Sequence, residues 1–182
     1  AIKPLVVYTP LLERGYTASS MLEDKKVADG PKNANNSYAG SVSIRTAVEK
    51  SINTVAWSKF NELGAETAMQ YLLDMKFKDI MPQDYTGSSA LGGFTRGAST
   101  LEMSGAYTAL ANGGVYRTPS CIVKIEDSYG NTVYEHQPEE KQVYEKSAAE
   151  AMTDILQGVM TNGTAKGLGV DGMPSAGKTG TT

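Results

Sequence analysis

The residues with the clearest chemical potential stand near the C-terminal end of the chain, where Lys178 is followed by Thr179 and Gly180. A lysine supplies a fixed positive charge for a substrate carboxylate, and a small glycine lets a ligand lie close against an extended backbone. The backbone N–H of the next residue, Thr181, can point at a developing oxyanion. This sequence therefore favours an edge strand beside an acyl-transfer site.

The same segment also matches a second, incompatible motif. From Gly172 to Thr179 the chain fits the phosphate-loop pattern G-x-x-x-x-G-K-T at every fixed position. Such a loop needs a buried strand before it and a helix after it, so that backbone N–H groups meet the phosphates. Residues 165–171 do not have the pattern of a buried strand, and Gly180 is a poor helix former. A nucleotide-binding protein is therefore the remote alternative.

Acyl transfer also requires a nucleophile and a base. A serine followed three residues later by a lysine puts both side chains on one helix face, where the amine can take the hydroxyl proton. The complete Ser-x-x-Lys, Ser175 to Lys178, lies in a Gly-rich segment and overlaps the other motif, so we interpret it as accidental. Lys3 is the stronger candidate because it stands near a helix start. We expect a serine directly before Ala1 to complete its motif.

Ser51 and Asn53 form a third candidate, Ser-x-Asn. The hydroxyl could relay a proton, and the amide could hold a substrate peptide group. Taken alone the signal is weak, because about half of chains this long contain such a triplet by composition. The structural alternative is a polar pair that caps the helix starting near Asn53.

Composition excludes several classes of function. The chain has 182 residues, about the length of one domain, and 40% of them are apolar. Its net charge of −3 provides no basic field for nucleic acid. With one cysteine and one histidine, an internal disulfide and a Cys/His zinc site are not expected, and no cofactor is predicted. A histidine-based triad could use only His136, which we expect to be exposed.

The elements that would position these residues follow from the hydrophobic periodicity. A hairpin is expected from the period-two pattern of 121–125 and 132–134 around a Gly-containing turn, with Cys121 buried in it. Helices alternating with short strands favour a mixed α/β (α+β) domain, in which an antiparallel sheet is flanked by helices. We expect helices over residues 2–14, 43–63 (interrupted at 51–53), 65–77, 100–112 and 147–160, and loops over residues 16–41 (with one short strand), 86–99 and 161–172, with a further element starting at 174.

Taken together, the motifs resemble those of the penicillin-binding transpeptidases. That family orders Ser-x-x-Lys, Ser-x-Asn and Lys-Thr-Gly along the chain, and here Lys3, Ser51 with Asn53, and Lys178 follow in that order. The likeness is closest to the class A, bifunctional type, and implies that 1–182 is part of a single transpeptidase domain. Flanking segments that also resemble the family are 2–5, 88–93, 99–103, 106–107, 111–114, 163–165 and 176–182.

The resemblance implies a D,D-transpeptidase that cross-links peptidoglycan through a serine acyl-enzyme. The serine before Ala1 would attack the D-Ala-D-Ala amide of a stem peptide, with Lys3 as the base. Ser51 would relay the proton to the leaving D-alanine, and Asn53 would hold the substrate amide. β-Lactam antibiotics would acylate the same serine.

The resemblance also implies roles for the residues of the Lys-Thr-Gly motif, the binding partners and the cellular location. Lys178, Thr179 and Thr181 would hold the terminal carboxylate beside Gly180, and the N–H of Thr181 would form half of the oxyanion hole. The expected partners are stem peptides, β-lactams and the rest of the same polypeptide. That polypeptide would be anchored upstream at the outer face of a bacterial membrane. A non-catalytic β-lactam sensor domain and a serine β-lactamase remain as alternatives.

Overall fold

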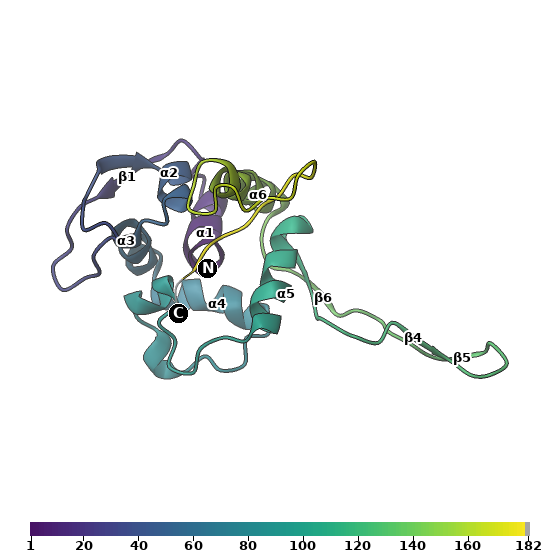
Figure 1. The fold of residues 1–182 in the computed structure, drawn as a ribbon. Helices are drawn as coiled ribbons and strands as arrows, with labels where there is room; N and C mark the ends of the chain where they lie inside the picture. The colour runs from purple at the N-terminus through teal and green to yellow at the C-terminus, as the bar shows by residue number, and fades with distance from the viewer. Residues whose placement is uncertain (181–182) are drawn as a thin grey trace.

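The chain folds into a body of helices from which one long hairpin extends (Figure 1). The computed structural model describes residues 1–180. In chain order the elements are η1 (Pro4–Tyr8), α1 (Thr9–Glu13), β1 (Met21–Asp24), β2 (Gly40–Ser43), α2 (Ile44–Glu49), α3 (Asn53–Leu63), α4 (Ala65–Asp74), η2 (Pro82–Asp84), η3 (Gly87–Leu91), α5 (Thr100–Ala111), β3 (Val115–Arg117), β4 (Lys124–Glu126), β5 (Thr132–Glu135), β6 (Glu140–Gln142) and α6 (Lys146–Thr161).

The first helical segment lies at the centre of the body. The π-helical turn η1 runs directly into α1, and every residue from Pro4 to Leu12 is buried. A helix that is apolar around its whole circumference must be covered on all sides; here η1 packs against α3 and α4, and α1 against α6. As a result Lys3, at the start of this segment, is only 6% exposed.

The predicted interruption of the second helical segment is confirmed. The Ser43 hydroxyl caps α2 by accepting a hydrogen bond from the N–H of Thr46 at 3.1 Å. After α2 ends, Ser51 adopts a left-handed backbone conformation with φ of +55°, and α3 begins at Asn53. This break turns the polar residues of 51–53 toward the central helix instead of continuing them along one helix face.

The other predicted helices are confirmed within a few residues. Gly64, at φ of +87°, separates α3 from α4. Ser99 and Glu102 form a capping box at the start of α5, so that its ends match the prediction closely. The apolar side of α6 packs against α1, α2 and α5 and closes the core from above in the view of Figure 1.

The predicted class, helices with short antiparallel strands, is confirmed, but within residues 1–180 the strands do not form one sheet. They make three separate antiparallel pairs, β1 with β2, β3 with β6, and β4 with β5. The segment predicted as a loop with one strand holds β1, and β2 ends it. In the pair β1–β2, β1 contacts α3 and β2 contacts α2, whereas β3 of the pair β3–β6 contacts α5.

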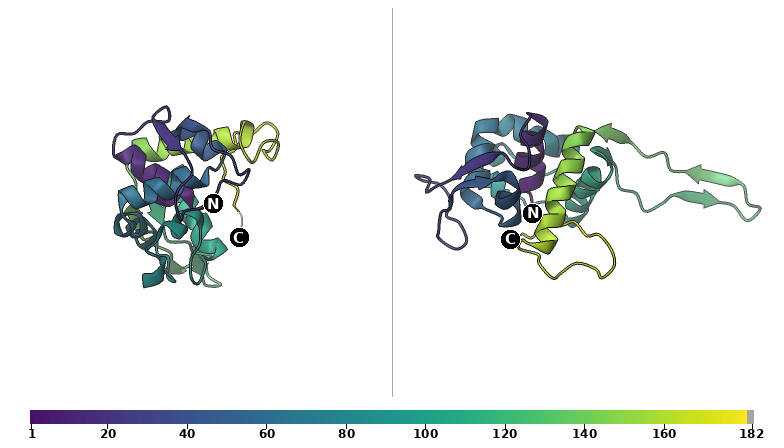
Figure 2. Two further views of the ribbon diagram at one scale, coloured as in Figure 1. Left: turned by 90° about the vertical axis from the view of Figure 1, so that its left-hand side faces the viewer. Right: turned by 90° about the horizontal axis from the view of Figure 1, so that it is seen from above.

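The hairpin carries β4 and β5 well away from the body (Figures 1 and 2). Its two strands pair as predicted, although β4 begins three residues later than the predicted 121–125, and all of their residues are exposed. Cys121, which we expected to be buried, is exposed as well, and His136 is half-buried. The prediction for Cys121 was wrong because a period-two pattern does not reveal whether a core lies behind the strand.

The segment after α6 runs back across the body to the start of the chain. The N–H of Gly177 donates to the carbonyl of Leu156 at 3.3 Å, and Gly180 lies against the backbone of Ala1. Residues 174–180 form no strand or helix, so the expected edge strand is absent there. No strand of the described chain forms a ladder of backbone hydrogen bonds with these residues, and a β-strand needs such a partner. Within 1–180, no helix is long and apolar enough to cross a membrane.

Candidate active site

Segments that are distant in sequence line one cavity of about 330 Å³. Three of them are the start of the central helix, the turn between α2 and α3, and the end of the described chain. The cavity therefore brings the three predicted motifs together. Its lining residues are Ala1, Lys3, Ala34, Lys50, Ser51, Asn53, Leu91, Thr164, Thr179 and Gly180.

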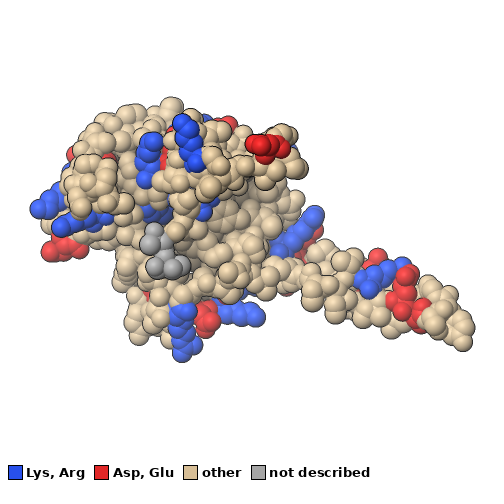
Figure 3. All heavy atoms as spheres, in the orientation of Figure 1, with Lys and Arg blue, Asp and Glu red and all other residues tan. Residues whose placement is uncertain are grey.

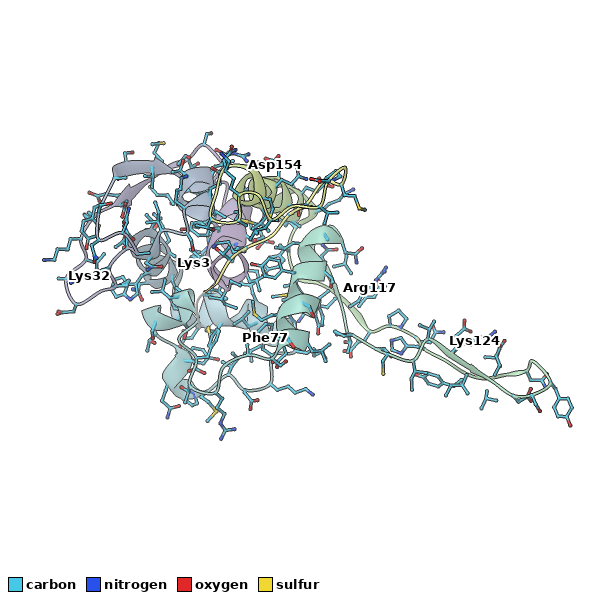
Figure 4. The ribbon with its side chains drawn as sticks, viewed as in Figure 1. Lys3, Lys32, Phe77, Arg117, Lys124 and Asp154 are labelled. Carbon is cyan, nitrogen blue, oxygen red and sulfur yellow. The ribbon has the colours of Figure 1, made fainter. Side chains whose placement is uncertain are left out.

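The Lys3 amine is the most constrained group of this site. Its Nζ donates to the Ser51 carbonyl and to Oδ1 of Asn53, both at 2.6 Å, and lies 3.2 Å from the Ser51 hydroxyl. Figure 4 shows Lys3 in the interior of the body, beside the returning end of the chain. This lysine is therefore held by the second motif and is no solvated surface residue.

The Ser51 hydroxyl lies between two lysines. Lys178 donates to its Oγ at 2.8 Å and also to the carbonyl of Thr179 at 3.1 Å. The left-handed backbone of Ser51 costs a non-glycine residue about 1–3 kcal/mol, and such strain is concentrated at functional positions. The hydroxyl can accept from one amine while it donates to the other.

Burial changes the acidity of both lysines. It lowers the pKa of Lys3 to about 7, with a smaller contribution from the positive charge of Lys178. It also lowers the pKa of Lys178, to about 8. Close to neutral pH, the cavity can therefore hold one amine that accepts a proton and one ammonium that attracts an anion.

Asn53 is fixed at both ends of its amide. Its Oδ1 accepts from Lys3, and its Nδ2 donates to the carbonyl of Lys32 at 2.9 Å. An amide nitrogen carries two hydrogens, so one remains for a ligand in the cavity. The alternative that Ser51 and Asn53 cap α3 is not supported, because the N-cap is Ile52 and it makes no side-chain hydrogen bond.

The last motif borders the cavity without forming a strand. The Thr179 hydroxyl lies 2.6 Å from that of Thr164, and Gly180 lines the cavity. A Cβ on Gly180 would lie 2.7 Å from the backbone nitrogen of Ala1, so this close approach requires glycine. Thr181 lies outside the described residues.

The phosphate-loop alternative fails its structural test within the described residues. Residues 165–173 are turns and bends, and no helix begins by Gly180. The amine of Lys178 is directed at Ser51, whereas in a phosphate loop the lysine reaches the phosphates that the backbone N–H groups of the loop bind. The match of residues 172–179 to the phosphate-loop pattern is therefore accidental.

Sequence reasoning did not name every residue at the site. Lys50 and Leu91 line the cavity, and the Tyr107 hydroxyl donates to the carbonyl of Ala1 at 2.6 Å. Leu91, Tyr107 and Thr164 stand in segments noted only as flanking resemblance, whereas Lys50 had no signal. Within 1–180, no group of three or more His, Cys, Asp and Glu side chains could hold a metal ion.

Comparison with known sequences identifies relatives over the whole chain. The family model "Penicillin binding protein transpeptidase domain" matches residues 1–182. Penicillin-binding protein 4 of Bacillus subtilis is 33% identical over 186 residues, which cover 100% of this chain and 30% of that protein. Penicillin-binding protein 1F of the same organism is 38% identical, with 99% of this chain and 25% of that protein covered. The chain thus spans less than a third of the length of these relatives.

Solved structures share the fold. The D,D-transpeptidase domain of a peptidoglycan glycosyltransferase from Eggerthella lenta matches 98% of this chain and 52% of its own, with a TM-score of 0.78 at 23% identity. Penicillin-binding protein A from M. tuberculosis, as an imipenem acyl-enzyme complex, matches 86% of this chain and 42% of its own, with a TM-score of 0.71 at 16% identity. By its sequence and its fold, the chain belongs to the penicillin-binding protein transpeptidase domain family.

Proposed function

We propose that the cavity is the acyl-transfer site of a serine D,D-transpeptidase that cross-links peptidoglycan stem peptides. The observation that carries this proposal is the buried amine of Lys3, which has a pKa of about 7 and is held by Ser51 and Asn53 beside a second lysine. The proposed nucleophile is a serine directly before Ala1, contributed by the rest of the polypeptide.

In the acylation step, the neutral Lys3 amine accepts the proton of the serine hydroxyl. A neutral amine has two N–H donors and one lone pair. Its two shortest contacts, to the Ser51 carbonyl and to Oδ1 of Asn53, use the donors and leave the lone pair for the hydroxyl. The serine oxygen then bonds to the carbonyl carbon of the penultimate D-alanine, and a tetrahedral intermediate forms.

Collapse of that intermediate breaks the C–N bond to the terminal D-alanine. The leaving nitrogen needs a proton, and the Ser51 hydroxyl, 3.2 Å from the Lys3 amine, can pass it on. In this relay, Ser51 donates its own proton to the leaving amine while it accepts one from Lys3. The free N–H of Asn53 holds the substrate amide in register during the transfer.

Residues near the end of the described chain, Lys178 and Thr179, are proposed to bind the substrate carboxylate. Lys178 uses two of its three N–H groups on Ser51 and Thr179, and the third can meet the terminal carboxylate of the donor peptide. The Thr179 hydroxyl, oriented by Thr164, adds a second donor. Thr181, outside the described residues, is proposed to complete the carboxylate site and the oxyanion hole with its N–H.

The acyl-enzyme is then consumed by an amine of a second stem peptide, which forms the cross-link. β-Lactams are proposed to acylate the same serine, consistent with the imipenem acyl-enzyme complex of a structural relative. The longer relatives support the further proposal that this region acts within a larger polypeptide. We also propose that this polypeptide is anchored at the outer face of a bacterial membrane.

Turnover by the whole protein tests this function. The protein is incubated with a D-Ala-D-Ala thioester analogue and an acceptor D-amino acid, and the products are resolved by mass spectrometry. Transpeptidase activity predicts many turnovers and a product that carries the acceptor. A single acylation without turnover would instead identify a sensor domain, and rapid hydrolysis of penicillin would identify a β-lactamase.

A further inference from the structure

A buried polar network joins the loop between β1 and β2 to the start of α3. Its members are Asp24, Asn33 and Thr54, with exposed fractions of 2%, 7% and 1%. None of them belongs to the three motifs. Buried polar groups are stable only when their hydrogen bonds are made, so the partners of each show what the network holds in place.

Asn33 caps α3 from outside the helix. The first N–H groups of a helix lack partners within it, and the N-cap residue Ile52 has no polar side chain to offer. Oδ1 of Asn33 accepts from the N–H of Asn53 at 3.0 Å and from that of Thr54 at 3.2 Å. A residue twenty positions upstream therefore does what an N-cap side chain ordinarily does.

The carboxylate of Asp24 holds Asn33 in this position. Nδ2 of Asn33 and the hydroxyl of Thr54 both donate to Oδ1 of Asp24, at 2.8 and 2.5 Å. The N–H of Ala39 donates to the other carboxylate oxygen at 2.8 Å. Burial opposes ionisation, but the hydrogen bonds from Thr54, Ala39 and Asn33 outweigh it and hold the pKa of Asp24 below its usual value. The group is therefore an anion at neutral pH.

The network reaches the site through Asn53. Asn33 fixes the backbone N–H of Asn53, and the carbonyl of the adjacent Lys32 accepts from the Asn53 amide at 2.9 Å. The other end of that amide accepts from Lys3 at 2.6 Å. Figure 4 shows Lys32 on the loop at the outer edge of the body and Lys3 in the interior, so the network bridges loop and catalytic cavity.

We propose that Asn33, held by the buried carboxylate of Asp24, is a positioning residue of the acyl-transfer site. It fixes the orientation of Asn53 and, through Asn53, that of the Lys3 amine. This inference rests on the function proposed above. Because reacting groups displaced by about 1 Å can lose up to about a hundredfold in rate, loss of this support should slow acylation more than it weakens ligand binding.

The first test uses Asn33→Ala in the whole protein, with a fluorescent penicillin as the probe. We expect the acylation rate at saturating penicillin to fall about tenfold or more, with the dissociation constant before acylation within about threefold of the unchanged protein. The matched control is Asn61→Ala, an exposed asparagine on α3 itself, which should keep the parent rate. A folded Asn33→Ala protein that is acylated within twofold of the parent rate would overturn the proposal.

A second pair of variants keeps the test decisive if Asn33→Ala does not fold. Asn33→Asp retains the acceptor for α3 but faces Asp24 with a second carboxylate. Below about pH 6 the two adjacent carboxyls share a proton, and the protonated one can donate a hydrogen bond as the amide of Asn33 does. The acylation rate of this variant relative to that of the parent should therefore rise below this pH. Combining Asn33→Asp with Asp24→Asn restores a donor beside an acceptor and should recover part of the rate. The recovery is incomplete because the Ser37 carbonyl, which accepts from Nδ2 of Asn33 at 2.9 Å, loses its donor in both variants.

The outcomes separate the two proposals. A folded double variant as slow as Asn33→Asp alone would contradict a positioning role for the pair. If the unchanged protein is not acylated by penicillin at all, the proposed function fails and the positioning role fails with it. Normal acylation of the parent together with normal acylation of the folded Asn33→Ala variant removes only the positioning role.

Discussion

At the scale of single residues, two lysines with different pKa values contact one hydroxyl group, that of Ser51. Lys3 is buried and tied to Ser51 and Asn53, whereas Lys178 approaches the same Ser51 from the end of the described chain. Their pKa values of about 7 and about 8 let one be neutral while the other is charged. A base and an anion site can thus coexist within one small cavity.

These pKa values predict a bell-shaped pH profile for acylation. The proposed base must be neutral, so the rate should rise as pH passes through about 7, the pKa of Lys3. The substrate carboxylate needs the charge of Lys178, so the rate should fall as pH passes through about 8. The second-order rate constant of acylation by a fluorescent penicillin, measured from pH 5.5 to 9.5, checks this prediction.

Lys178→Arg is the matched control for this profile. A guanidinium stays charged throughout the range, so the falling limb should disappear while the rising limb remains. A flat profile in the parent would contradict the assignment of Lys3 as the base. A falling limb that persists in a folded Lys178→Arg protein would contradict the role of Lys178.

At the scale of elements, the turn that follows α6 is docked against the end of α2. The N–H of Thr164 donates to the Glu49 carbonyl at 3.0 Å, and Thr164 in turn orients the hydroxyl of Thr179. Gly163 permits this contact, because a Cβ there would lie 2.5 Å from the Glu49 carbonyl oxygen. One short segment, residues 163–164, therefore contributes both to core packing and to the proposed substrate site.

Gly163→Ala should accordingly damage both stability and activity. Relief of the backbone clash must shift residues 163–164, and we expect a loss of about 1–3 kcal/mol in the free energy of unfolding, measured by denaturant titration. Gly169→Ala is the control, since a Cβ there would approach no atom more closely than the Ser175 hydroxyl oxygen, at 3.8 Å. Equal stabilities of the two variants would show that the close approach at Gly163 is not needed.

How much the sequence could reveal differs between helices and site. Periodicity and capping residues are local signals, and they predicted α5 and the break at Ser51 within a few residues. The cap of α3 by Asn33 and the contact between Thr164 and Thr179 join residues far apart, so no local pattern announces them. The exposure of Cys121 was likewise invisible, because alternation does not show which strands lack a covering layer.

At the scale of the whole molecule, the candidate site lies in the helical body and the hairpin stands apart from it. The site draws on residues near 3, 51 and 178, so it exists only when the body is folded. The hairpin extends away from that body in both views of its length (Figures 1 and 2). On the face that Figure 3 shows, several basic side chains lie on the helical body with acidic ones among them, and both charge signs occur on the hairpin.

Shortening the hairpin should therefore leave the site intact. The N–H of Thr118 donates to the Glu139 carbonyl at 3.1 Å, so the two arms are already joined at the base. Replacing residues 120–138 with Asn-Gly leaves a three-residue loop, which starts at Pro119, between Thr118 and Glu139. This change should alter the free energy of unfolding by less than about 1 kcal/mol and acylation by less than about twofold. A large loss of acylation in a folded protein would show that the hairpin contributes to the site.

The central claim is that this cavity performs serine acyl transfer with Lys3 as the base. The most direct test is mass spectrometry of the whole protein after exposure to penicillin, with peptide mapping across Ala1, beside the folded variant Lys3→Arg. We predict one penicillin adduct on a serine directly before Ala1 and almost none in the variant, because arginine cannot act as a base near neutral pH. No adduct on the folded parent, or an adduct on another residue, would contradict the account.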